Sequence, residues 1–88
     1  AKRIVDALIS HDISKAEEAL YYYRSSFDDV CMRFADCTAT DFTERTDSSY
    51  PGVWVYFKLT ERDGKQKTSF VALRKDDRQR VWYVDGGL

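Results

Sequence analysis

Apolar residues in the first part of the chain recur at the three-and-four spacing that is typical of amphipathic helices. A short first helix that ends near Ser10 is predicted by one apolar face, formed by Ile4, Val5, Leu8 and Ile9. Beyond it, a second apolar seam requires one longer helical face and consists of Ile13, Ala16, Leu20, Tyr23, Phe27, Val30 and Phe34. The seam survives residues 25–29, but the polar residues around Phe27 could equally end one helix and cap another, so we expect a kink or break there.

The break between the two helices, "SHDISKAEE", offers two alternative N-caps. Asp12 can accept a backbone N–H directly, whereas Ser14 and Glu17 form the S-x-x-E pattern of a capping box. Either assignment begins the second helix at residues 13–15. His11 is the one histidine of the chain, and a lone histidine beside an aspartate is more often a turn residue than half of a catalytic dyad. We therefore interpret His11 as an exposed turn residue and assign no catalytic residue.

From residue 38 the spacing of apolar residues changes from three or four, as in a helix, to two, which predicts strands. Residues 38–46 and 53–61 form the first two predicted strands, with "DSSYPG" as the loop between them. Asp63-Gly64 predicts a two-residue hairpin loop, and a turn at "KDDRQ" leads to the last strand, "RVWYVD". The prediction is a single α+β domain over residues 1–88, with N-terminal helices packed on one face of a curved antiparallel sheet of three to four strands.

The two-residue loop fixes a register in which Phe57 pairs with Phe70 and Trp54 with Leu73. Both sheet faces are then apolar, and the helices can cover only one of them. The second face is rich in aromatic residues, so we predict a protein interface formed by Trp54, Tyr56, Val71, Leu73 and Trp82. The simplest partner is a second copy, which gives a homodimer, and another protein is the alternative. An ordinary solvated sheet with scattered surface aromatics is the competing interpretation.

Composition and charge argue against several function classes. Eighty-eight residues provide one core, and 14 basic against 15 acidic residues create no net field that would attract nucleic acid. The basic residues around the second hairpin are half offset by neighbouring acids, so nucleic acid is disfavoured as a partner. The longest apolar run has five residues, against about 20 needed to span a bilayer, so no membrane insertion is expected. The chain begins with Ala1 and not with Met, which indicates trimming and leaves a cytoplasmic or an exported location open.

Cys31 and Cys37 are the two cysteines of the chain. In one continuous helix they would lie about 9 Å apart, beyond the roughly 7 Å that a disulfide tolerates between Cα atoms. A bridge therefore requires the helix to end before Cys37. Two cysteines and one distant histidine also fall short of a four-ligand zinc site. We expect two buried, unpaired thiols, no metal and no cofactor.

Two segments, "IVDALISHDISKAEEAL" and "KDDRQRVWYVDGG", give the chain a resemblance to the NTF2-like (cystatin-like α+β) superfamily. The first is similar to the opening pair of helices in such domains, and the second to their Trp-containing final strand. The resemblance implies that Asp12 caps the second helix. Because many such domains are accessory or scaffolding parts, it also allows a non-catalytic binding or assembly module.

The same resemblance implies an alternative function. Relatives of this kind include isomerases and dehydratases with an apolar pocket between helices and sheet. The alternative function is therefore a pocket domain that binds a small apolar ligand and extends to isomerase- or dehydratase-like chemistry. The candidate pocket residues are Tyr23, Phe27, Phe57, Phe70, Tyr83 and Asp85. Asp85 would act as a base if burial raised the pKa of its carboxyl, although its position before Gly86-Gly87 also suits a turn.

Overall fold

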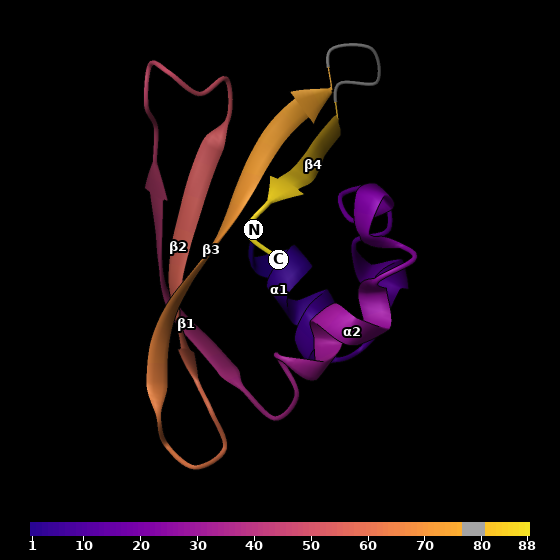
Figure 1. Ribbon diagram of the computed structural model, residues 1–88, viewed down its shortest axis with the longest axis vertical. Coiled ribbons are helices and arrows are strands. Elements are labelled where there is room, and N and C mark those ends of the chain that lie inside the picture. Colours follow the sequence, from indigo (N-terminus) through magenta and orange to yellow (C-terminus); the bar gives the residue numbers. More distant parts are fainter. Residues whose placement is uncertain (77–80) are drawn as a thin grey trace.

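A computed structural model describes residues 1–76 and 81–88, which form a helical layer on one side of an antiparallel sheet (Figure 1). The described residues form, in order, α1 (Lys2–Ile9), the 3₁₀ turns η1 (Ile13–Lys15) and η2 (Tyr21–Tyr23), α2 (Phe27–Met32), β1 (Thr38–Arg45), β2 (Val53–Thr60), β3 (Gln66–Asp76) and β4 (Val81–Gly86). The predicted α+β class, with helices before strands, is confirmed.

Helix α1 ends at Ile9 as predicted and buries Ile4, Val5, Ala7 and Leu8. His11 then adopts a positive φ of 55°, which turns the chain toward η1. Asp12 is the N-cap of η1, because its Oδ1 accepts hydrogen bonds from the Ser14 backbone N–H at 3.1 Å and from the Ser14 hydroxyl at 2.6 Å. Of the two predicted caps, Asp12 is therefore the one that forms.

The predicted long helix over residues 13–34 is wrong. The chain leaves helical geometry at Ala16, with φ −151° and ψ 43°, and continues as the short elements η2 and α2. The carbonyl of Ala19 accepts a 2.8 Å hydrogen bond from the Val84 N–H of β4, a tertiary contact in place of a helical one. All seam residues nevertheless face inward, because spacings of three also suit 3₁₀ turns. The expected break near residues 25–29 is present, since α2 begins at Phe27.

The four described strands form one open sheet in the order β1-β2-β3-β4, with antiparallel neighbours. Its inner face packs on the helical layer, and the most deeply buried side chains of that core are Phe57, Leu8, Leu20, Leu59, Val5, Val71 and Val84. A bulge interrupts the β1–β2 ladder between Thr40 and Thr43, where Asp41 has a φ of 59°. Strands β1 and β4 are the two edges of the sheet.

The predicted register of the β2–β3 hairpin is wrong by one residue. Phe57 pairs with Ser69, Tyr56 with Phe70 and Trp54 with Ala72. The loop is longer than predicted, because the N–H of Glu61 donates to the Lys65 carbonyl at 2.8 Å and leaves residues 62–64 to make the turn. Gly64, with a φ of 89°, supplies the left-handed position that such a three-residue loop requires.

This shift exchanges the two faces of β3, since neighbouring residues of a strand point to opposite sides. Val71 and Leu73 belong to the core, and Phe70 and Ala72 lie on the outer side. The other predicted strand positions agree with β1, β2 and β4 within about a residue. The predicted turn at "KDDRQ" falls mostly on residues 77–80, outside the described residues.

Candidate functional site

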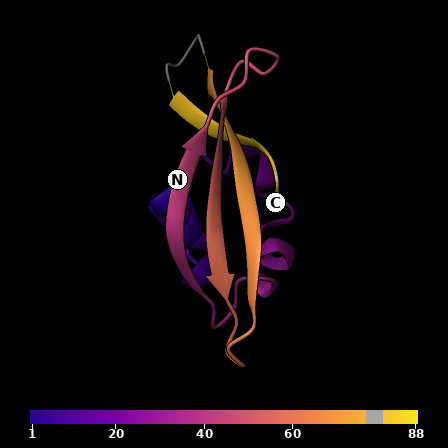
Figure 2. The same cartoon turned by 90° about the vertical axis from the view of Figure 1, so that its left-hand side faces the viewer.

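The outer side of the sheet carries a group of aromatic residues on its two central strands. Trp54 and Tyr56 of β2 lie opposite Ala72 and Phe70 of β3, and we refer to these four residues as the aromatic face. The Tyr56 and Phe70 ring centroids are 5.6 Å apart, and Phe70 is 39% exposed. Figure 2 shows that, in the described residues, the helices lie behind the sheet and leave this side uncovered.

Tyr50, from the loop before β2, extends the aromatic face. Its ring stacks on Trp54 with a centroid distance of 5.0 Å and an angle of 6° between the planes. The Tyr50 hydroxyl donates a 2.8 Å hydrogen bond to Oδ2 of Asp85 in β4. Burial, followed by this hydrogen bond, raises the pKa of Tyr50 to about 12, so the neutral phenol is retained as the donor.

The loop that carries Tyr50 is held by its own polar contacts. Oδ1 of Asp47 accepts hydrogen bonds from both the N–H and the hydroxyl of Ser49, at 2.8 Å each. At Gly52 the loop passes so close to β3 that a Cβ would lie 2.1 Å from the Leu73 carbonyl oxygen. Glycine is therefore needed at position 52 to bring Tyr50 onto Trp54.

Charged side chains border the aromatic face. The Arg45 guanidinium lies over the Tyr56 ring, 5.4 Å from its centroid, and Asp85 is exposed on the opposite edge strand. Farther along the sheet, Lys58 and Asp41 form an exposed ion pair at 3.7 Å. The face thus combines an aromatic centre with both signs of charge at its borders, a composition compatible with a protein interface.

The five residues predicted as an interface do not share one face. Trp54 and Tyr56 lie on the outer side as predicted, but Val71 and Leu73 are 0% and 8% exposed in the core. Trp82 pairs with Lys75, two residues from the inward-facing Leu73, and lines a groove on the helical side. The one-residue register shift is the reason for these differences, and it also caused Phe70 to be missed.

The six predicted pocket residues are not brought around one cavity. Phe27 and Phe57 are buried in the core, where Phe57 contacts the rings of Phe34 and Phe42 at centroid distances of 6.4 and 5.3 Å. These rings fill the space in which the pocket was predicted. Tyr23 packs against the core, Phe70 is on the aromatic face, Tyr83 contacts Tyr22, and Asp85 is exposed.

A groove of about 770 Å³ does lie between the helical layer and the sheet, at a different place. Its floor is formed by Val53, Val55 and Leu73, and the small side chains of Ala16 and Ala19 leave room in its wall. Its other lining residues are Ala1, Arg3, Ile4, Ser14, Glu17, Glu18, Glu44, Val81 and Trp82. Sequence reasoning missed the groove, because it depends on how the two layers pack.

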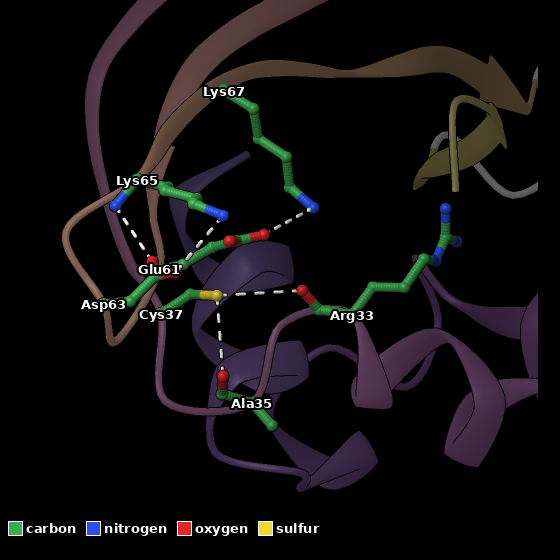
Figure 3. A network of polar contacts seen from close by, with 7 residues as sticks. All are labelled: Arg33, Ala35, Cys37, Glu61, Asp63, Lys65 and Lys67. Carbon is green, nitrogen blue, oxygen red and sulfur yellow. Dashed lines mark hydrogen bonds and ion pairs between the residues drawn. The ribbon is translucent and has the colours of Figure 1, made fainter.

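The two cysteines are buried and unbridged, as expected. Figure 3 shows the Cys37 thiol donating to the carbonyls of Arg33 at 3.7 Å and Ala35 at 3.5 Å. Burial raises the pKa of both thiols, and the charge of Glu61 adds to the effect at Cys37. A raised pKa disfavours the thiolate, the reactive form, so neither thiol has the character of a nucleophile.

His11 is an exposed turn residue, as predicted. Its Nε2 lies 2.7 Å from Oδ1 of Asp28, and its ring meets Phe27 edge-on at 5.6 Å. Residues 1–76 and 81–88 contain no group of three or more side chains placed to hold a metal ion. None of the helices in this described part combines the length and apolar character needed to cross a bilayer.

Comparisons with known proteins add no relative: no family model, no curated protein and no solved structure matches this chain.

Proposed function

We propose that this domain is a non-catalytic binding or assembly module that acts through protein–protein contact of its aromatic face and forms a homodimer. The observation that carries the proposal is the position of Trp54, Tyr56 and Phe70 together on the side of the sheet that the described helices leave uncovered. Aromatic residues of this kind dominate the binding energy of protein interfaces, since each buries a large area.

We further propose that the domain is NTF2-like. The order of elements supports this assignment, because short helices precede an antiparallel meander and Asp12 caps the segment after the first helix. Many such domains are accessory or scaffolding parts, which agrees with the proposed binding function.

The first test compares self-association of the wild type with that of two aromatic-face variants by sedimentation velocity. Trp54→Ala should weaken the dimer about tenfold or more, a typical cost for truncating a central interface aromatic. Tyr56→Glu should yield a monomer, because it replaces a central aromatic ring of the contact with a carboxylate whose desolvation opposes association. Tyr21→Glu is the matched control, since Tyr21 is exposed on the helical layer and should leave the dimer unchanged.

A wild type that stays monomeric at roughly millimolar concentration, far above the micromolar range of a weak specific complex, would contradict the proposal. Equal association of the wild type and both aromatic-face variants would do the same. Circular dichroism of each variant checks that the fold is retained.

The groove supports a second candidate function, the binding of a small apolar molecule. Its volume is in the range of roughly 300–1,000 Å³ typical of ligand sites, and its floor is apolar. Asp85, the predicted base, lies outside the groove lining, so we propose that the groove binds such a molecule without catalysis. Titration with 1-octanol should produce saturable NMR shifts of the Val53 and Leu73 methyl groups, and Ala19→Phe, which narrows the wall, should abolish them. Shifts that survive this substitution would argue against the groove as the site.

A further inference from the structure

The side chains of the aromatic face lie in rows that cross the sheet. In one row Arg45 of β1 faces Trp54, Trp54 pairs with Ala72, and Ala72 pairs with Gly86 of β4. In the next row Thr43 faces Tyr56, which pairs with Phe70. One row therefore sets a bulky residue on β2 opposite a small one on β3, and the next row sets two aromatic residues opposite each other.

We propose that the partner is a second copy of this chain, whose outer sheet side faces that of the first copy. A two-fold axis between the two sheets relates the copies; it runs parallel to the strands and passes over the line between β2 and β3. This inference rests on the proposed function of the aromatic face. Such an axis lays β2 over the partner's β3 and β1 over the partner's β4. Tyr56 then meets the partner's Phe70, and Trp54 with Tyr50 stacked on it lies across from the partner's Ala72, which is itself only 6% exposed.

Charge complementarity favours this axis. Arg45 lies at the β1 end of its row and Asp85 beside the β4 end, so the axis sets each arginine opposite the partner's Asp85. Asp85 lies on the outer side, because Tyr50 reaches it from its position on Trp54. That hydrogen bond occupies Oδ2 and leaves Oδ1 for the guanidinium. A two-fold axis perpendicular to the strands would set β1 on the partner's β1 and lose the pair.

The size of the face agrees with a weak dimer. Four strands of 8, 8, 11 and 6 residues, about 4.8 Å apart and with about 3.3 Å per residue, give a face of about 500 Å² per copy. The total of about 1,000 Å² is at the lower end of specific interfaces. Two twisted sheets pack at an angle of about 30°, so their closest contacts lie near the axis. Arg45 and the partner's Asp85 lie farther out, and the long side chain of Arg45 spans the gap between them.

A charge-swap experiment tests this arrangement. Arg45→Glu and Asp85→Arg should each weaken the homodimer about tenfold or more in sedimentation experiments, because both reciprocal pairs become repulsive. An equimolar mixture of the two variants should associate again, since every pair in the mixed dimer then has opposite charges. The double variant should also dimerise. Lys15→Glu is the matched control, because Lys15 is exposed on the helical layer and away from the proposed interface.

Asp85→Arg also removes the acceptor of the Tyr50 hydroxyl, and Tyr50→Phe measures that effect separately. If Tyr56→Glu abolishes the dimer and the mixture of charge variants fails to restore it, the two-fold arrangement is overturned and the proposed function stands. If the wild type does not self-associate, or if Tyr56→Glu leaves its dimer intact, the proposed function fails together with this inference. Restoration by the mixture supports both.

Discussion

Tyr50 is a single residue that connects three parts of the structure. Its ring stacks on Trp54 of β2, its hydroxyl binds Asp85 of β4, and its backbone N–H donates to the Asp47 carbonyl within its own loop. Only the neutral Tyr50 hydroxyl can donate to Asp85, and the raised pKa reflects how the fold favours that form. The strength of this contact therefore depends on pH.

The folded-state pKa of Tyr50 is about 12, above the ordinary value of about 10. The stability that the hydroxyl contributes is therefore fully present below pH 10 and is lost as the pH rises toward 12. We expect the difference in the free energy of unfolding between the wild type and Tyr50→Phe to be constant near neutral pH and to shrink over that interval. Urea unfolding monitored by tryptophan fluorescence measures it, and a difference that does not vary with pH would contradict the contact.

At the scale of elements, the apolar seam predicted the buried side of the helical layer but not the type of helix. A spacing of three residues suits both a 3₁₀ turn and an α-helix, and the hydrogen bond from Val84 to Ala19 favours the broken form. Such a tertiary contact has no signal in the local sequence.

The seam predicts a sharp contrast between neighbouring residues. Leu20→Ala should lower the free energy of unfolding by about 2–5 kcal/mol, because Leu20 is fully buried and its truncation leaves a cavity. Tyr21→Ala should cost less than about 1 kcal/mol, since Tyr21 is mostly exposed. Chemical denaturation of both variants measures the difference. Similar losses for the two would show that residues 16–23 do not pack as described.

The hairpin shows why strand positions were easier to predict than register. Asp63-Gly64 correctly located the loop, but a glycine with positive φ suits both a two-residue and a three-residue loop. The choice between them decides whether Phe70 or Val71 faces outward. Alternation within β2 placed Trp54 and Tyr56 on one side independently of the loop, and these were the interface residues predicted correctly for the outer side.

For the whole molecule, the change of apolar period at residue 38 was enough to predict helices on one face of an antiparallel sheet. The layers follow from patterns within single elements, whereas the groove follows from the fit of one layer against the other. The small residues in its wall, Ala16 and Ala19, became informative only once the sheet lay opposite them. The same holds for Tyr50, whose partners Trp54 and Asp85 come from two different strands.

The two edges of the sheet also affect how copies can add to one another. At β4 the N–H of Val84 is already bonded to Ala19, and at β1 the left-handed Asp41 distorts the strand. Both features hinder the addition of a further strand, which is the step that produces open-ended fibrils. Contact through the aromatic face, in contrast, covers the same face on both copies and leaves none of it free for a third copy. If copies associate through the proposed two-fold contact, association ends at two copies, and a rise in concentration increases the share of dimer without lengthening a polymer.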